Sequence, residues 1–408
     1  MARAIGRGPL LSLAFSNLEI AFCGIRCENP FFLASSVFSN NYQMMARAFE
    51  AGWAGVFSKT ICLQDIHEVS TRFDAVTDAI SMIGFRDMEQ FSGNPVSADF
   101  AILHSLKMDY PSKVVIASIM GQNENQWISL AKMAEEAGAD AVELNFSCLQ
   151  MAEMGMGSDV GQDEELLMRY TACVKQNVKL PVIAKMTPNI TKFNMPALGT
   201  YFAGASENSA LNTIQGITMS PLAAVSGKQT ISGYSGSAVK PISLRFIYEL
   251  ASNAIVPNVE LSGIGGIETW HDALEFIQLG CRNVQVCTAV MQYGYRIIDD
   301  LICGLQNYMA ERGIDRLETL VGEQLPNLAL PADLDRVKVV FPKIDREKCI
   351  GCGRCYTSCT EGGHQAINFD SETRQPQIVG TKCVGCHLCR LVCPIGAIGL
   401  SKRICKKI

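Results

Sequence analysis

The chain has 408 residues and a net charge of −5 at neutral pH, with an isoelectric point of about 5.7. This length is sufficient for one large domain and one small domain. The acidic balance excludes the basic surface expected of a nucleic-acid-binding protein, and no apolar run is long enough to span a membrane.

The first residues carry Arg3 and Arg7 before a short apolar run, Leu10–Phe15. That run is shorter than the hydrophobic region of a secretory signal. Of the 17 cysteines, eight lie in two runs near the C-terminus, and the others show no disulfide-framework spacing. Free thiols are typical of a reducing compartment, so we expect a cytoplasmic protein.

Short apolar runs alternate with amphipathic helical stretches from residue 29 onward. Helices are predicted at Asn41–Ala51, Trp127–Ala137, Glu164–Val178 and Trp270–Leu279, and three of them stop at a glycine, a common C-terminal cap. Eight β–α units in roughly 300 residues predict an α/β fold, a (β/α)8 TIM barrel, rather than an open sheet. The predicted strands are Asn29–Ala34, Gly55–Ser58, Val114–Ser118, Ala141–Asn145, Val182–Lys185, Ser209–Leu211, Val259–Ser262 and Asn283–Val286.

In such a barrel the chemistry takes place where the strands end and the loops begin. Loop residues are commonly polar, and a lysine at a strand end is often simply solvated. Two lysines and two asparagines meeting at one mouth nevertheless favour a functional site there. The residues at the predicted strand ends are Ser35, Lys59, Asn145, Lys185, Asn212, Gly263 and Thr288.

The last part of the chain repeats the spacing C-x2-C-x2-C-x3-C, and Pro394 follows the second copy. This repeat is typical of bacterial ferredoxins with two 4Fe–4S clusters, in which the fourth cysteine of each run binds the other cluster. Zinc is the alternative, but zinc sites typically use two separated pairs of ligands. The predicted quartets are Cys349, Cys352, Cys355 and Cys393 for one cluster, and Cys383, Cys386, Cys389 and Cys359 for the other. We therefore expect a barrel over residues 1–330 and a ferredoxin-like domain over 331–408.

Several segments together resemble the flavin and iron–sulfur subunit of bacterial NAD-dependent dihydropyrimidine dehydrogenases, within the wider group of FMN barrels that includes dihydroorotate dehydrogenases. The resemblance runs from about Leu18 to Leu400. The segments that carry it are Asn29–Ser36, Lys59–Thr60, Asn145–Cys148, Ala184–Asn189, Ser232–Gly236, Ser262–Ile267 and Gln285–Thr288.

The resemblance implies FMN as the cofactor of the barrel. It places Ala34, Ser35, Lys59, Asn145 and Lys185 along the flavin ring and its ribityl chain, with Lys185 near N1, where a positive charge stabilises the reduced ring. Gly236 belongs to the same predicted set. By spacing alone, Gly263–Gly266 is a tight turn. The resemblance instead implies a phosphate site made by Gly265, Gly266, Cys287 and Thr288.

Cys148 resembles the family's general acid. By itself, a cysteine at this point is more often a small buried apolar residue. At the end of a barrel strand, a thiol near its ordinary pKa of about 8.5 stays protonated at neutral pH and can donate a proton. The glycine-rich loop that follows, Met154–Gly161, is predicted to be a mobile lid.

Substrate binding is predicted at Asp87, Glu89, Asn145, Ser147, Asn212 and Thr213. An amide side chain both donates and accepts hydrogen bonds, which matches the edge of a pyrimidine base. Two positions depart from the family pattern: Asp87 stands where an asparagine is usual, and Leu149 stands where a proline is usual. An ionised Asp87 can only accept, so the substrate is left open.

The resulting prediction is an enzyme that reduces the 5,6 double bond of uracil or thymine. The chain has no dinucleotide-binding Gly-x-Gly-x-x-Gly unit, so a separate subunit that binds FAD and NAD(P)H is expected to supply the electrons, in a hetero-oligomer. Two alternatives remain. One is a dihydroorotate-dehydrogenase-like or related cyclic-amide oxidoreductase with a changed substrate, and the other is an electron-transfer subunit whose barrel site has decayed.

Overall fold

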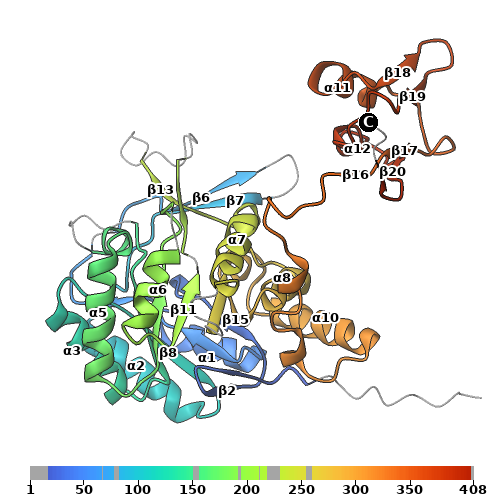
Figure 1. The fold of residues 1–408 in the computed structure, drawn as a ribbon. Helices are drawn as coiled ribbons and strands as arrows, with labels where there is room; N and C mark the ends of the chain where they lie inside the picture. Colours follow the sequence, from blue (N-terminus) through green and yellow to red (C-terminus); the bar gives the residue numbers. More distant parts are fainter. Residues whose placement is uncertain are drawn as a thin grey trace, which may run out of the picture. The chain divides into compact units, whose positions relative to one another are not determined.

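A computed structural model describes residues 17–66, 68–77, 82–149, 156–191, 194–210, 212–217, 230–253 and 260–405. The chain divides into two compact units, Met1–Asn327 and Leu328–Ile408 (Figure 1). Within the described residues no helix is both long and apolar enough to cross a membrane.

Eight parallel strands of the first unit close into a barrel. The ring closes because β15 pairs with β3, and β4 pairs with β8. The predicted (β/α)8 fold is confirmed. The barrel strands are β3 (Phe31–Leu33), β4 (Gly55–Phe57), β8 (Val114–Met120), β9 (Ala141–Asn145), β10 (Val182–Lys185), β11 (Glu207–Ala210), β14 (Glu260–Ile264) and β15 (Cys281–Val286).

Helices cover the outside of the barrel (Figure 1). Their ends follow local sequence signals: the side chain of Asn41 accepts a bond from the backbone of Met44 at the start of α1, and Gly52 takes a left-handed conformation at its end. The helices are α1 (Tyr42–Ala51), α2 (Val96–Asp109), α3 (Glu124–Glu136), α4 (Ser158–Gly161), α5 (Glu164–Asn177), α6 (Asn194–Phe202), α7 (Lys240–Ala251), α8 (Trp270–Gln278), α9 (Thr288–Tyr293) and α10 (Ile297–Arg312). Short 3-10 turns are η1 (Val37–Ser39), η3 (Ser237–Val239), η4 (Leu317–Leu320) and η5 (Leu325–Asn327).

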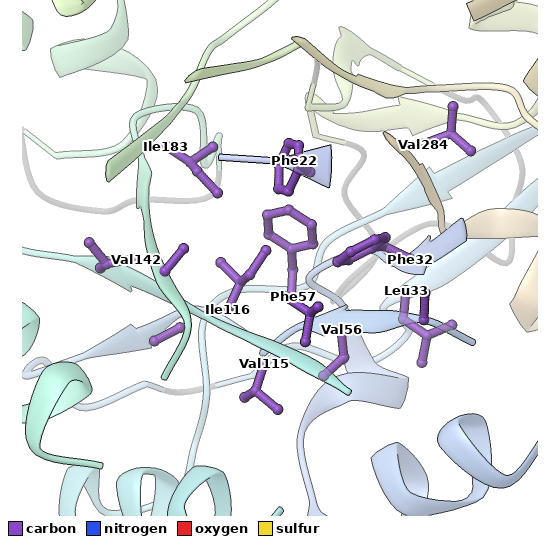
Figure 2. Close-up of a cluster of buried hydrophobic side chains, with 14 of the residues drawn as sticks. Phe22, Phe32, Leu33, Val56, Phe57, Val115, Ile116, Val142, Ile183 and Val284 are labelled. Carbon is purple, nitrogen blue, oxygen red and sulfur yellow. The ribbon is translucent and has the colours of Figure 1, made fainter. Parts of the chain in front are cut away.

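Alternate residues of each strand face the interior of the barrel. The inward residues of some strands are mainly apolar, and those of the others are mainly polar. On the apolar side, Phe32 and Phe57 pack with Phe22 (Figure 2), and the Phe22 and Phe32 ring centroids are 5.9 Å apart. Phe22 comes from a hairpin of β1 (Ile20–Phe22) and β2 (Ile25–Cys27). The buried inward residues of the polar side are Glu143, Lys185, Glu207, Ser209, Ser262, Asn283 and Gln285.

A separate antiparallel sheet was not predicted from the sequence. It joins two distant segments in the order β12 (Ile214–Gly216), β13 (Ser232–Ser235), β7 (Met82–Asp87) and β6 (Phe73–Thr77). Gly84 makes room for the Tyr234 ring, since a Cβ on Gly84 would lie 1.8 Å from the Tyr234 hydroxyl. A two-residue strand, β5 (Ile61–Cys62), pairs with β8.

The second unit is small and is built around its cysteines. Its buried cluster consists of Cys355, Cys359, Cys383 and Cys389 with Ala366, Ile367 and Ile398. Three two-stranded antiparallel sheets pair β16 with β21, β17 with β20, and β18 with β19. The elements are β16 (Lys338–Val339), β17 (Pro342–Ile344), α11 (Arg354–Gly362), β18 (Ile367–Asp370), β19 (Gln375–Ile378), α12 (Leu388–Leu391), β20 (Ile398–Leu400) and β21 (Ile404–Cys405).

Candidate active site and cluster sites

One large cavity lies at the C-terminal ends of the barrel strands and encloses about 1110 Å³ of space, including its open mouth. Its wall joins the strand ends, the separate antiparallel sheet and the loops after β13, β14 and β15. The structure brings nearly all the predicted barrel-site residues to this wall, and their individual roles remain predictions. Those at the wall are Ala34, Ser35, Lys59, Asp87, Glu89, Asn145, Cys148, Lys185, Asn212, Thr213, Gly236, Gly265, Gly266, Cys287 and Thr288.

The floor of the cavity carries a buried charge pair that sequence reasoning missed. Lys185 Nζ lies 3.8 Å from Glu143 Oε1, and the Ser118 hydroxyl donates to the same oxygen at 2.8 Å. Burial raises the pKa of Glu143, and Lys185 opposes this shift. A signal existed in the sequence, because Glu143 stands two residues before Asn145 and so faces the same side of the strand.

Ser147 lies behind the cavity wall rather than in it. Its side chain is completely buried; its hydroxyl donates to Asn145 Oδ1 at 2.7 Å and accepts from Asn212 Nδ2 at 2.9 Å. Asn145 also donates to Thr60 at 2.8 Å. Ser147 therefore orients two asparagines, and the prediction that it contacts substrate directly does not fit its position.

An ion-pair network occupies the other side of the cavity. Glu89 pairs with both Lys59 and Arg72, and Glu68 lies 3.8 Å from Lys59 and 3.7 Å from Arg72. The side chains of Lys59 and Glu89 are both 7% exposed. Glu89 thus already has two cationic partners, which restricts its predicted role in substrate binding.

Asp87 lies in the same wall and accepts a bond from the backbone N–H of Glu89 at 2.6 Å. Removal from bulk water raises the pKa of Asp87 to about 7, and the nearby Glu89 charge adds to the rise. At neutral pH a large fraction of Asp87 is therefore protonated. A neutral carboxylic acid both donates and accepts, as the asparagine of the family pattern does.

A glycine cradle forms the part of the wall predicted to bind phosphate. Gly265 and Gly266 have φ angles of +115° and +77°. A Cβ on Gly265 would lie 2.3 Å from Ser243 Oγ, and one on Gly266 would lie 2.7 Å from Lys240 Cβ. Only glycine fits both positions, because the φ angles are positive and a side chain would meet α7.

Cys148 lies at the cavity wall next to Leu149. Of the loop predicted to be a lid, residues 154 and 155 lie outside the described residues. The remainder packs into the unit: Met156 and Val160 are buried, and a Cβ on Gly161 would lie 2.1 Å from the carbonyl oxygen of Phe146. Residues 156–161 of the loop therefore pack against the rest of the unit, and none of them lines the cavity.

The second unit contains two cavities, and each is lined by one predicted quartet. Cys349, Cys352, Cys355 and Cys393 line one cavity of about 350 Å³. Cys359, Cys383, Cys386 and Cys389 line another of about 360 Å³. The backbone N–H groups of Ala366 and Ala397 donate to Cys359 Sγ at 3.3 Å and to Cys393 Sγ at 3.2 Å. Each run thus contributes its fourth cysteine to the cavity of the other run.

The spacing of these sulfur atoms distinguishes a cluster from a zinc ion. A tetrahedral zinc ion with Zn–S bonds of about 2.3 Å holds its sulfur ligands about 3.8 Å apart. In the part of the chain that the structure describes, no three sulfur atoms of either quartet lie within 4.8 Å of one another. This sulfur spacing fits a larger iron–sulfur cube better than one zinc ion.

The barrel cavity and the two cysteine-lined cavities are the features of an oxidoreductase that carries a flavin and iron–sulfur clusters. The sequence profile of the dihydroorotate dehydrogenase family matches residues 17–309, and that of the 4Fe-4S dicluster domain matches residues 342–400. The chain belongs to the dihydroorotate dehydrogenase family, carries a 4Fe–4S domain and is an oxidoreductase.

Three relatives illustrate the range of similarity. NAD-dependent dihydropyrimidine dehydrogenase subunit PreA of Escherichia coli K12 is 49% identical over 398 residues, 96% of this chain and 97% of the relative. Chloroplastic dihydropyrimidine dehydrogenase (NADP(+)) of Arabidopsis thaliana is 36% identical over 78% of this chain and 79% of its own length. The catalytic subunit of dihydroorotate dehydrogenase B (NAD(+)) of Pyrococcus furiosus is 34% identical over 75% of this chain and 98% of its own length. The family resemblance stated from the sequence is confirmed.

The cofactors of such a chain are FMN in the barrel and 4Fe–4S clusters in the second unit. The residues present fit both groups. The glycine cradle offers open backbone to a phosphate, Lys185 provides a cation at the cavity floor, and Gln285 Oε1 in the cavity wall has no protein partner among the described residues. Eight cysteines surround the two smaller cavities.

Proposed function

We propose that the chain reduces the 5,6 double bond of a pyrimidine base, uracil or thymine, with electrons that a separate NAD(P)H-oxidising subunit passes through two 4Fe–4S clusters. The observation that carries this proposal is the shared cavity wall of Cys148, Asn145 and Asn212. One thiol and two fixed amides are the groups that saturating a cyclic amide requires. The names of the relatives from E. coli and A. thaliana support the same substrate class.

Saturating one C=C bond adds a hydride to one carbon and a proton to its neighbour. FMN, when bound, supplies the hydride. The Cys148 thiol donates the proton. Ser147 fixes the Asn145 and Asn212 side chains through bonds of 2.7 and 2.9 Å, so the second N–H of each amide group can meet the base without reorganising.

Asp87 fits this scheme in its neutral form. A protonated Asp87 donates to a ring carbonyl as the usual asparagine does, so the departure from the family pattern retains a donor below about pH 7. Ionised Asp87 repels a carbonyl oxygen and accepts only from a ring N–H. The substitution thus makes base binding depend on pH rather than abolishing it.

A partner subunit is proposed because the chain needs an electron source. The sequence has no Gly-x-Gly-x-x-Gly unit between a strand and a helix. The E. coli relative is itself named as a subunit of an NAD-dependent enzyme. A flavin-containing NAD(P)H-oxidising subunit, docked so that electrons enter through the clusters, completes the path.

The test compares electron donors and substrates under anaerobic conditions. We expect the chain alone to reduce uracil or thymine with dithionite or a reduced dye, but not with NADH, until the partner subunit is added. Cys352→Ser should keep FMN and lose only the partner-dependent reaction. Cys405→Ser, outside both quartets, is the matched control.

Other outcomes would contradict parts of the proposal. Rapid FMN reduction by NADH in the isolated chain would reveal a nucleotide site in this chain. Turnover of dihydroorotate in place of pyrimidine bases would favour the function named for the P. furiosus relative. No flavin reoxidation by any cyclic amide would favour a decayed barrel site.

A further inference from the structure

The polar half of the barrel interior contains carboxyl groups for which the proposed reaction has no use. Glu143, Glu207 and Glu260 occupy one register row, because Ile183 pairs with Glu143 and with Glu207, and Glu207 pairs with Glu260. Glu143 and Glu207 are completely buried, whereas the Glu260 side chain, at the N-terminal end of its strand, is 29% exposed. Ile183, also completely buried, separates Glu143 from Glu207 in this row, and Glu260 is the member of the row that reaches solvent.

Inward-facing polar atoms in this row and in the rows nearer the cavity lack hydrogen-bond partners among the described residues. Asn283 faces inward because it pairs with Ser262, whose hydroxyl accepts a bond from the inward-facing Gln285 at 2.9 Å. Buried polar atoms without a protein partner are usually bonded to internal water. Their concentration in one half of the barrel indicates a hydrated interior. The atoms are Glu143 Oε2, Glu207 Oε1, Gln285 Oε1 and both side-chain polar atoms of Asn283.

The lower end of the row is tied to the β1–β2 turn. The Cys23 thiol donates to Glu207 Oε2 at 3.2 Å, and the Cys23 backbone N–H donates to Glu260 Oε2 at 2.6 Å. Arg282 lies 3.4 Å from the other oxygen of Glu260. Burial raises the pKa of Glu207 well above its usual range, and the charges of Glu260 and Glu143 add to the rise. Burial and these charges favour the neutral form of Glu207, against the hydrogen bond from Cys23, which lowers the pKa.

We propose that a column of side chains carries protons between solvent and the Lys185–Glu143 pair. The column consists of Glu143, Asn283, Glu207, Cys23 and Glu260. Through it, Glu143 gains a proton when negative charge accumulates in the cavity above Lys185. The inference rests on the proposed function, in which clusters deliver electrons without protons. The step is a proton transfer alone: the Glu143 carboxylate and one solvent proton give the neutral acid. The proton returns to solvent when the charge leaves.

The electrostatic reason lies in the 3.8 Å contact between Lys185 and Glu143. In a site closed to bulk water, Lys185 is the cation that favours ionised Glu143, whereas burial favours its neutral form. A second anion near Lys185 competes for the same ammonium group. The balance at Glu143 then shifts toward protonation, and the column offers the proton a path from the end of the barrel opposite the cavity.

The test measures protons, in the holoenzyme, without pyrimidine and without a partner subunit. The bound FMN is photoreduced in weakly buffered solution with a pH indicator. We expect wild type to take up about one more proton per flavin than Glu143→Gln. Asn283→Leu fills the column with an apolar side chain and should slow the uptake about tenfold or more, since it displaces the internal water. Asn283→Ser, which leaves room for water, should keep the wild-type rate.

A second readout needs no cofactor. In the flavin-free chain at pH 7, the infrared spectrum should contain a neutral carboxylic acid band that Glu207→Gln removes and that shifts promptly in deuterium oxide. Equal proton uptake in wild type and Glu143→Gln would overturn the proposal. The absence of the Glu207 band would also overturn it, for example because a metal ion occupies Cys23, Glu207 and Glu260. A Glu207 band that does not exchange in deuterium oxide would overturn it as well. Failure to reduce pyrimidines would count against the proposed function and leave these measurements unaffected.

Discussion

Lys59, which the sequence predicts to contact the flavin, forms an ion pair with Glu89, which it predicts to contact the substrate. Arg72 pairs with the other carboxylate oxygen of Glu89. Both members of the Lys59–Glu89 pair are almost fully buried, so removing Glu89 leaves Lys59 with only the more distant Glu68, 3.8 Å away. The two predicted binding roles are therefore coupled through one electrostatic unit.

Breaking this pair from one side should destabilise the barrel. We expect Glu89→Gln to lower the free energy of unfolding by about 2–4 kcal/mol, because Lys59 and Arg72 lose their shared carboxylate. The double variant Lys59→Met with Glu89→Leu should recover most of this loss while binding FMN more weakly. Urea unfolding and FMN titration measure both effects. Glu249→Gln, which breaks an exposed pair with Arg245, should change stability by no more than about 0.5 kcal/mol.

Replacing the predicted acid should separate binding from turnover. Cys148→Ala should retain FMN and lose turnover by about 10²–10⁴-fold, the usual contribution of a general acid. Steady-state kinetics with a reduced dye and uracil give kcat, and the flavin spectrum gives occupancy. Cys303→Ala, on the exposed face of α10, should behave as wild type. An unchanged kcat in Cys148→Ala would assign the proton to another group.

The raised pKa of Asp87 predicts a pH-dependent affinity for the base. Asp87 is mainly neutral below about pH 7 and mainly ionised above it. Donation to a ring carbonyl is therefore present at lower pH and lost as the pH rises, so KM for uracil should increase above about pH 7. Asp87→Asn should abolish that increase and keep the low value. If both proteins show the same KM profile between about pH 6 and about pH 9, then Asp87 does not face the base.

The glycine cradle predicts a contrast between two glycines with positive φ. Gly265→Ala places a methyl group 2.3 Å from Ser243 Oγ, so it should displace the loop and weaken FMN binding strongly. Gly313→Ala meets no atom within 4 Å and should cost only the backbone strain, about 1 kcal/mol. FMN titration and thermal unfolding of both variants test this. Wild-type FMN affinity in Gly265→Ala would show that this loop does not hold the cofactor.

The barrel could be predicted because each of its strands carries a local signal. A strand such as Ala141–Asn145 is short, apolar and bounded by turns, and the structure places β9 at the same residues. The sixth strand was predicted at Ser209–Leu211, whereas β11 spans Glu207–Ala210. Its polar residues are buried because they bond across the interior, as Ser209 does with Gln285 at 2.7 Å. Leu211 lies outside the described residues.

Other elements gave no local signal. The apolar residues of α2 are spread around the helix rather than along one face, so no amphipathic pattern marked Val96–Asp109. Strands β7 and β13 are stabilised by pairing with each other, as Tyr234 does with Arg86. Such contacts between distant segments cannot be read from either segment alone. For the same reason, the sequence predicted the residues around the cavity but not the hydrogen bonds of Ser147 or the ion pairs of Glu89.

The antiparallel sheet beside the cavity has a consequence for how substrate range can change. β7 and β13 carry Phe85, Asp87, Gly233 and Ser235 to the cavity wall, and they reach it as partners in one ladder. Grafting either strand alone from a relative would mismatch side chains that fit across the ladder, such as the Tyr234 ring over Gly84. Exchanging β7 and β13 together preserves the packing across the ladder and leaves the barrel strands unchanged. Recombination between family members at this sheet is therefore expected to yield folded chimaeras only when both segments share one parent.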